Sequence, residues 1–387
     1  MVCDNYGIIS CDNRGDLKMI EVTDLSFFVL KIIIGTIGLI AFGIFFGLIY
    51  KGVDRKLSAH MQGRIGPPVR QPFRDIVKLF TKENIVPENA IPWVYNLAPL
   101  IGLIATITIL LYLPIGGFEP LLSTQGDLIL ILYLLLIPSL AMVIGGFASG
   151  SPYAIVGAQR EMATMIGYEF PLAIVIVTFA WSLGNHSLAP AVFGLDAPVQ
   201  NTFSLAVISG IPIWGTVGII GLIGVIVLLF ALLIVTPAEL SKIPFDTPEA
   251  ETEIAGGLLT EYSGRNLGIF YLTDAVKTVV MATIIVALFF PWNLAELLSV
   301  ENPIWLVYLL NIVFFLIKVL IVIIFSVTLV RVAIARLKID QIVYTYWLWI
   351  TLFALAGLIL IMWDQQFIVS KWWALENYNP LVTYLGL

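Results

Sequence analysis

Residues 128–148, LILILYLLLIPSLAMVIGGFA, contain no charged side chain. A helix that crosses a bilayer needs about 20 consecutive apolar residues, so this stretch is long enough to span a membrane. Backbone groups in lipid must satisfy one another, which favours a helix. Further runs of this kind lie at 26–50, 93–113, 162–184, 211–235, 267–290, 304–330 and 342–363. The sequence therefore predicts an all-α polytopic membrane protein with about eight transmembrane helices.

The composition favours one membrane domain. The chain has 387 residues, of which 59% are hydrophobic and 12% charged, whereas a soluble globule has about a quarter charged. We see no internal repeat and no separate soluble domain. We expect a single domain over 1–387 that consists of spans, polar tails and polar loops. The tails are about 1–25 and 364–387, and the loops are 51–92, 149–161, 236–266 and 331–341.

The distribution of basic residues predicts the orientation of the spans. The four polar loops hold 14 of the 20 lysine and arginine residues, and the alternate loops 114–127, 185–210 and 291–303 hold none. Basic residues are enriched in cytoplasmic loops of membrane proteins. We therefore expect a multi-pass protein of the cell membrane, with both termini outside and the four polar loops in the cytoplasm.

Two cysteines, Cys3 and Cys11, lie in the N-terminal tail. Their spacing matches no zinc or iron–sulfur pattern, and two cysteines alone cannot hold a cluster. The sequence leaves a disulfide and two free thiols open.

Segment 72–82, PFRDIVKLFTK, has the pattern of an amphipathic helix. Phe73, Ile76, Val77 and Phe80 share one helical face, with charged residues opposite. Such a helix can lie in the membrane interface. It can equally be a surface helix that covers other helices, and the sequence does not separate these two interpretations.

Charged residues inside the spans are candidates for function, because burying a charge in lipid is costly. Glu169 lies in the fourth span, Asp274 and Lys277 in the sixth, and Lys318 midway along the seventh. Asp274 and Lys277 are one helical turn apart and can pair. We expect Glu169, Asp274 and Lys318 to contribute to ion coupling.

A cluster of acids lies between the fifth and sixth spans. The run 244–253, PFDTPEAETE, holds Asp246, Glu249, Glu251 and Glu253, and Glu261 follows. If 247–258 is helical, three of these acids share one face. Carboxylates packed together in a poorly hydrated site have raised pKa values, so they can exchange protons near neutral pH. A solvated acidic loop is the alternative. Burial is favoured because apolar residues interrupt the run and it contains almost no lysine.

Other charges on the same side could neutralise these acids or dock a partner. Arg160 and Glu161 open the fourth span, and Arg64 lies in the first polar loop between Gly63 and Gly66.

At these residues the chain resembles the subunit 1 family of respiratory complex I, the NADH-quinone oxidoreductase of bacteria. The matching stretches are GRIGPPVRQPFRDIVKLFTKE (63–83), SPYAIVGAQREMATMIGYE (151–169), AELSKIPFDTPEAETEIAGGLLTEYSG (238–264) and RVAIARLKIDQ (331–341). They cover all four predicted cytoplasmic loops in order. The resemblance agrees with the number of spans that the apolar runs predict independently.

The resemblance implies a role in a larger complex. Family members join the membrane arm of respiratory complex I, or of related membrane-bound hydrogenases, to its peripheral arm. The implied partners are the peripheral iron–sulfur and large hydrogenase-like subunits, antiporter-like and small membrane subunits, and the lipid bilayer. No nucleic-acid partner is expected. The chain itself would carry no redox centre or cofactor, because iron–sulfur clusters and any nickel–iron centre would lie in its partners.

The resemblance also transfers roles to individual positions. The acid run gives Asp246, Glu249, Glu251, Glu253 and Glu261 as ion-coupling residues, with Glu169 from the YE pair. Arg64, Arg160, Glu161, Tyr168, Tyr262, Arg336 and Asp340 fall in the loop motifs that would dock partners.

Two departures from the family pattern bear on the branch. Quinone-reducing members usually have R-x-G-P-N where this chain has Arg64–Pro68, and P-R-x-R-x-D-Q where it has Ala335–Gln341. Both spellings are more similar to the energy-converting hydrogenase and sulfur-reductase branch. The sequence thus favours a non-redox, ion-coupling subunit of that type, for protons or sodium ions.

Three alternatives remain. The first is a quinone-site subunit of a NADH- or F420-type dehydrogenase, which would have an open apolar tunnel from the lipid. The second is a stand-alone secondary transporter, which the lack of an internal repeat counts against. The third is a structural anchor whose acids only dock partners.

Overall fold

The computed structural model describes residues 9–11, 17–19, 22–123, 126–184, 203–210, 212–215, 217–298 and 303–369. Near the N-terminus, the short strands β1 (Ile9–Cys11) and β2 (Leu17–Met19) pair antiparallel. Cys3 lies outside the described residues, so the state of the two cysteines stays open.

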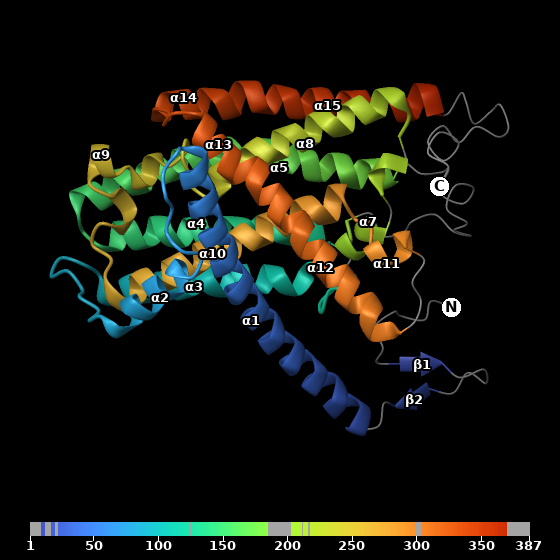
Figure 1. Cartoon of the computed structure of the whole chain (residues 1–387), viewed down its shortest axis with the longest axis horizontal. Coiled ribbons are helices and arrows are strands. Elements are labelled where there is room, and N and C mark those ends of the chain that lie inside the picture. The colour runs from blue at the N-terminus through green and yellow to red at the C-terminus, as the bar shows by residue number, and fades with distance from the viewer. Residues whose placement is uncertain are drawn as a thin grey trace.

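Eight helices of the described chain are long and apolar enough to cross a membrane, which confirms the predicted all-α polytopic fold. Their bounds are α1 Val22–Met61, α3 Pro92–Tyr112, α4 Asp127–Ala148, α5 Pro152–Gly184, α8 Ile219–Glu239, α10 Gly264–Phe289, α12 Ile304–Ile323 continued to α13 Leu329–Ala333, and α14 Ile339–Tyr344 continued to α15 Thr351–Trp363. Most of them run roughly alongside one another, and α1 and α12 cross the others obliquely (Figure 1). Short helices α7 (Leu205–Gly210) and α11 (Leu294–Leu297) lie in the connections.

Two helices extend beyond the predicted spans. Helix α1 continues past residue 50 to Met61, and α5 begins at Pro152, ten residues before the predicted start. Proline suits the first turn of a helix because its missing N–H has no partner there. The polar loops 51–92 and 149–161 are therefore partly helical.

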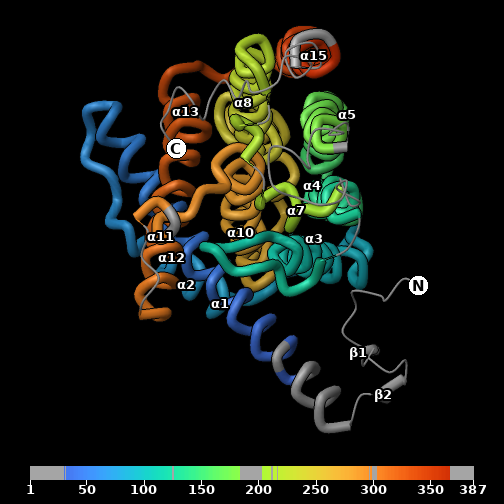
Figure 2. Tube along the Cα trace, turned by 90° about the vertical axis from the view of Figure 1, so that its right-hand side faces the viewer, coloured from blue at the N-terminus to red at the C-terminus, as the bar shows by residue number. Residues whose placement is uncertain are grey.

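Helix α10 is the centre of the bundle. It is almost entirely buried along its length, and Figure 2 shows it among α1, α3, α8 and α12. Its buried positions include charged and polar side chains as well as apolar ones, among them Lys277, Thr273 and Thr283. Polar groups on the most buried helix must find partners on its neighbours, so α10 is where a polar site is expected to form.

Helix α2 (Gln71–Thr81) packs across one end of the bundle beside α1 and α10. Phe73 and Ile76 pack against buried residues of α1 and α10. Val77 and Phe80 stay 64% and 45% exposed. One apolar edge of the segment therefore covers other helices, as a surface helix would, and another faces outward, while the position in the membrane interface stays a prediction. We call this end, with loops 62–91, 240–263 and 334–338, the loop end.

The acid-rich segment between α8 and α10 is not the continuous helix that we expected over 247–258. It contains a 3-10 turn at Thr247–Glu249, the one-turn helix α9 (Glu251–Ile254) and a second 3-10 turn at Gly257–Leu259. Ala255, Gly256 and Gly257 have φ values of 53°, 96° and 54°, a left-handed conformation that ends a helix. A Cβ atom on Gly257 would lie 1.9 Å from the Pro248 carbonyl oxygen, so the chain folds tightly back on itself.

Candidate functional site

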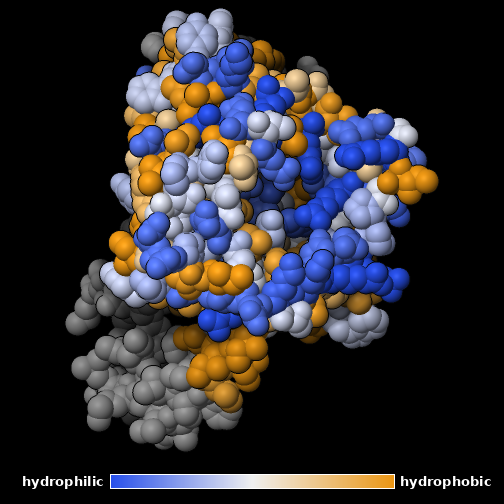
Figure 3. Space-filling view, turned by 90° about the vertical axis from the view of Figure 1, so that its left-hand side faces the viewer, coloured by the Kyte–Doolittle hydropathy of each residue, from blue (hydrophilic) through white to orange (hydrophobic). Residues whose placement is uncertain are grey.

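A cavity of about 420 Å³ lies at the loop end between α1, α8, α10 and the acid-rich segment. Six acids and six bases line it: Asp54, Glu239, Asp246, Glu249, Glu251 and Asp274, with Lys51, Arg55, Lys242, Lys277, Arg331 and Arg336. We call it the charged chamber. Figure 3 shows that this end of the molecule is covered mainly by hydrophilic residues and is hollowed near its middle.

Asp274 of α10 holds the middle of the chamber. Its carboxylate accepts hydrogen bonds from the ammonium groups of Lys51 and Lys242, each at 2.7 Å. The pairing between Asp274 and Lys277 that the sequence allowed does not form, because Lys277 turns toward a different acid. Asp274 thereby joins α1, α10 and the segment after α8.

A deeper layer surrounds Lys277. Its ammonium lies 2.8 Å from Glu239 Oε1 and donates to the Ser139 hydroxyl at 2.9 Å. Ser139 lies 3.3 Å from the Tyr168 hydroxyl. All four side chains are buried, Lys277 and Glu239 being only 4% and 2% exposed. This chain of contacts leads from the chamber toward the bundle interior on α4 and α5.

Glu161 adds a second buried carboxylate to this layer. One of its oxygens accepts a hydrogen bond of 3.4 Å from Ser241, and the other is buried without a partner in the described chain. An unpaired buried carboxylate oxygen is costly, so the arrangement is built to hold charge or a proton. Glu161 was expected to dock a partner, and this is wrong because only 1% of it is exposed.

The mouth of the chamber is held by two arginines. Arg336 binds both oxygens of Asp246, with its Nε at 2.8 Å from Oδ1, and donates to Thr252 at 2.9 Å. Arg331 lies 3.1 Å from Asp54. The hydrogen bond to Asp246 raises the pKa of Arg336 above its usual value. These pairs fix the mouth of the chamber in one arrangement.

Glu249 differs from the other acids of the chamber. It is half-buried and lines the cavity, yet its carboxylate makes no hydrogen bond or ion pair within the described chain. Burial raises the pKa of Glu249, the nearby Lys242 opposes this, and the Asp274 carboxylate adds to it. For Lys242, burial lowers the pKa and Asp274 and Glu249 raise it, with a net rise. Glu249 can thus change its proton occupancy without breaking an ion pair within the described chain.

The remaining acids of the run lie outside the interior of the chamber. Glu251 is exposed at its edge, and Glu253 pairs with Arg160 at 2.5 Å on the surface. Glu261 is half-buried, and only its backbone oxygen is used, as acceptor for the Tyr95 hydroxyl at 2.7 Å. The expected single face of carboxylates is therefore divided, because Asp246 is buried and Glu249 half-buried at the chamber, whereas Glu251 and Glu253 are exposed.

Two tyrosines that were predicted to dock partners are buried. The ring of Tyr262 stacks on that of Tyr95, with centroids 4.2 Å apart, and burial raises its pKa. Tyr168 is fully buried. Neither side chain is exposed for a partner. Arg64 and Asp340, in contrast, are exposed at the loop end and remain candidates for docking.

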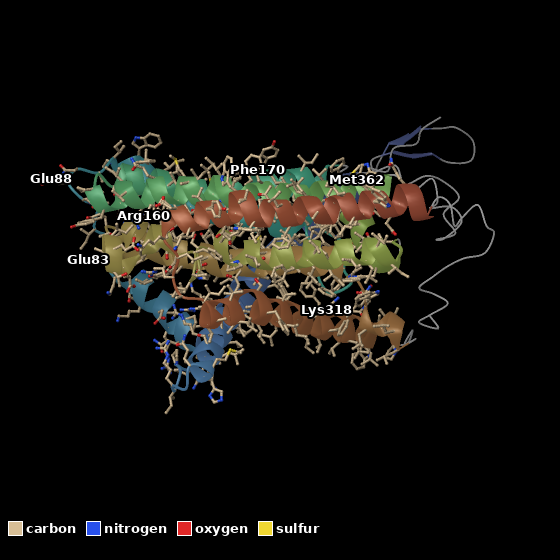
Figure 4. The ribbon with its side chains drawn as sticks, turned by 90° about the horizontal axis from the view of Figure 1, so that it is seen from above. Glu83, Glu88, Arg160, Phe170, Lys318 and Met362 are labelled. Atoms are coloured by element: carbon tan, nitrogen blue, oxygen red, sulfur yellow. The ribbon has the colours of Figure 1, made fainter. Side chains whose placement is uncertain are left out.

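Glu169 and Lys318 do not reach the charged chamber. Glu169 is half-buried about midway along α5, directly before Phe170, which Figure 4 labels, and it makes no hydrogen bond or ion pair within the described chain. Lys318 lies far from Arg160 and the loop end (Figure 4). Its ammonium donates to the carbonyls of Phe290 and Trp292 at 2.8 Å each. Glu169, Asp274 and Lys318, which were expected to contribute to ion coupling, are therefore not joined to one another by contacts within the described chain.

The position of Lys318 predicts a structural role. The last carbonyls of a helix lack partners, and a cation at the C-terminal end of α10 interacts favourably with them. Lys318→Met should lower the free energy of unfolding by about 1–3 kcal/mol, while Lys318→Arg should retain most of the stability. Thermal unfolding of the purified chain measures this effect. If Lys318→Met keeps native stability but abolishes ion transport, Lys318 contributes to ion coupling and the structural explanation is wrong.

Sequence reasoning missed six charged members of the chamber: Lys51, Asp54, Arg55, Glu239, Lys242 and Arg331. Lys51 and Lys242 were counted only as evidence for orientation. Glu239 and Lys242 lie within the motif at 238–264, so their presence beside the acid run was the available signal.

The fold and the chamber define a polytopic membrane protein that holds opposite charges together beneath a polar surface. A family model described as NADH dehydrogenase matches residues 34–362, and the chain belongs to this family, the complex I subunit 1 family that its motifs indicated.

Three relatives show the range of the family. The chain is 31% identical to the homologous subunit of NADH-quinone oxidoreductase from Syntrophotalea carbinolica, over 76% of this chain and 84% of that protein. It is 30% identical to hydrogenase-4 component C of Escherichia coli, over 80% and 89%. Its fold is similar to a chain of the membrane-bound sulfane sulfur reductase, an archaeal respiratory membrane complex, with a TM-score of 0.68, 26% identity and coverage of 86% and 99%.

Proposed function

We propose that this chain is the non-redox membrane subunit of a complex I-like respiratory complex. It anchors a peripheral electron-transfer arm and couples the redox reaction there to translocation of protons or sodium ions. The observation that carries the proposal is the charged chamber, in which Glu249 faces Lys242 and Asp274 without an ion pair of its own. A family member with a structural role alone would not need an uncompensated carboxylate in such a place.

The proposed mechanism begins with a change of charge in the peripheral arm. A negative charge near the mouth favours protonation of Glu249 and weakens its interaction with Lys242. Lys242 and Lys51 share the Asp274 carboxylate, so a shift of one lysine alters the other. The deeper pair of Lys277 and Glu239 responds next. The mechanism is thus a local change of charge that shifts the ion pairs of the chamber from one arrangement to another.

The loop end suits the docking of partners. Its surface is hydrophilic (Figure 3), and the exposed pair of Arg160 and Glu253 lies there. We propose that the partners are peripheral iron–sulfur and large hydrogenase-like subunits, with antiporter-like and small membrane subunits alongside. Any iron–sulfur or nickel–iron centre belongs to those partners. The loop end would face the cytoplasm, with both termini outside the cell membrane.

We place the complex in the hydrogenase or sulfur-reductase branch. The sequence of residues 64–68 favours this branch. The chain is similar to a hydrogenase component and to a chain of a sulfur reductase. The quinone-site alternative rests on the relative named for NADH and quinone. A second cavity does lie beside the chamber and shares Lys51, Arg55 and Tyr271 with it. Its lining combines six charged or polar side chains with five apolar ones, which differs from the apolar tunnel that a quinone site predicts.

The test is the variant Glu249→Gln in the complete complex, reconstituted in liposomes. We expect ion translocation to fall at least tenfold while the co-purifying subunits and their electron transfer are retained. Glu88→Gln is the matched control, because Glu88 is an exposed acid of the same loop end (Figure 4). Full translocation by the Glu249→Gln complex would mean that the acids only dock partners. Identification of the co-purifying subunits tests the branch.

The raised pKa of Glu249 predicts a dependence of stability on pH. Between the ordinary glutamate pKa, about 4.3, and its raised value, the folded chain binds a proton that the unfolded chain has released. Stability that depends on this group therefore falls as pH rises through that window. Glu249→Gln should lose less stability than the native chain between pH 5 and pH 8. Melting temperatures at both pH values measure the difference, and parallel pH profiles of the two chains would contradict it.

A further inference from the structure

The second cavity, of about 310 Å³, lies between α2, α1 and α10. We call it the interfacial cavity. Its polar lining is Lys51, Arg55, Asp75, Lys78, Lys82 and Tyr271, and its apolar lining is Leu48, Pro72, Ile76, Leu79 and Leu267. It is separate from the charged chamber but shares one wall with it.

The depth of this cavity follows from the length of α10. The helix has 26 residues, or about 39 Å, whereas the hydrocarbon core is about 30 Å thick. Each end therefore extends about 4–5 Å into the headgroup region. Leu267 and Tyr271 are about one and two turns from the N-terminus of α10, which is about 5–10 Å from that end along the helix axis. The cavity thus lies where lipid headgroups meet acyl chains.

Only some of the charged groups of the cavity form ion pairs within the described chain. Lys51 is held by Asp274 at 2.7 Å, and Arg55 by Asp75 at 3.1 Å. Asp75, the one acid in the lining, also accepts from Gln71 at 2.8 Å. Lys78 and Lys82 are exposed, and their ammonium groups have no acceptor within the described chain. Lys78 lies in the last turn of α2 and Lys82 directly follows the helix, four positions on, so both can reach one anion.

We propose that the interfacial cavity binds the headgroup of an anionic glycerophospholipid, with Lys78 and Lys82 holding the phosphate and the apolar wall covering the start of an acyl chain. Basic pockets beside membrane helices attract anionic headgroups. A zwitterionic lipid would bring its own cation toward four basic groups. A free phosphate ion would leave Leu48, Ile76 and Leu79 exposed to water, which argues for an amphiphile.

The full chain, isolated in detergent with its co-purifying subunits, provides the test. Native mass spectrometry would count retained phosphatidylglycerol after exchange into mixed phosphatidylglycerol and phosphatidylcholine micelles. We expect retention of phosphatidylglycerol over phosphatidylcholine, and about thirtyfold weaker retention by Lys78→Gln/Lys82→Gln, on the basis of the usual contribution of two lysines near a membrane surface. Leu79→Trp, which fills the cavity without changing its charge, should also reduce retention.

The matched control is Arg70→Gln/Arg74→Gln. These arginines are exposed beside the same helix and do not line the cavity, and the change in charge is equal. An equal loss in the control would mean diffuse attraction to the surface and would overturn the proposal. Displacement of the lipid by inorganic phosphate at the same concentration would mean a free-anion site and would overturn it too. Equal retention of both lipids would do the same.

Discussion

Replacing Asp274 with asparagine should destabilise the chain more than any change at the surface of the loop end. Asp274 is the shared partner of Lys51 and Lys242, and the three side chains are mostly shielded from water. Asparagine would leave two ammonium groups facing each other without their acid. Removal of one partner from a buried ion pair costs about 3–5 kcal/mol, which is a large fraction of the stability of a folded domain. We expect little folded chain in the membrane and a lower melting temperature.

Two further variants show whether charge is the cause. Asp75→Asn makes the same chemical change in the pair with Arg55, whose side chains are 37% and 38% exposed. It should cost less than about 1 kcal/mol. Adding Lys51→Met to Asp274→Asn should restore part of the stability, because it removes one of the two uncompensated charges. Both variants are measured by thermal unfolding in detergent. The explanation fails if Asp274→Asn melts at the native temperature.

The same residue shows what the sequence could and could not predict. The length of each apolar run is a local property, so the number and order of the spans were predicted, although α5 begins ten residues before its predicted start and α8 eight residues after. The partners of Asp274 lie 223 and 32 positions away in the chain. A helical spacing identifies Lys277 as a neighbour of Asp274, but packing decides which of several nearby charges each one meets. The identity of the partners therefore depends on the arrangement of helices, which no local pattern contains.

The acid run gives a second example. Its four carboxylates are alike in sequence, and a continuous helix was the simplest way to place them. The extended backbone at Ala250 separates Glu249, which lines the chamber, from Glu253, which is exposed, and the left-handed turn at Gly256 and Gly257 ends the helix. The glycine pair was visible in the sequence. Its close approach to Pro248 was not, because that contact depends on the path of the folded chain.

The buried pair of Lys277 and Glu239 can separate stability from coupling. The two groups lie 2.8 Å apart and are almost completely buried. Lys277→Met alone leaves Glu239 as an uncompensated carboxylate, and Glu239→Gln alone leaves the ammonium. Each single variant should lower the free energy of unfolding by about 3–5 kcal/mol. The double variant Lys277→Met/Glu239→Gln removes both charges and should recover most of that loss. The free-energy effects of substitutions at residues in direct contact are not additive.

Ion translocation, unlike stability, should not recover in the double variant. If the pair carries charge movement from the chamber toward Ser139 and Tyr168, the double variant assembles with native subunits but transports at least tenfold less. Ser139 and Tyr168 can keep their mutual contact in it, so a loss of transport would not reflect a lost tyrosine. Melting temperatures and liposome transport for the four members of the cycle measure both effects. Recovery of transport together with stability in the double variant would show that the pair only holds the helices together.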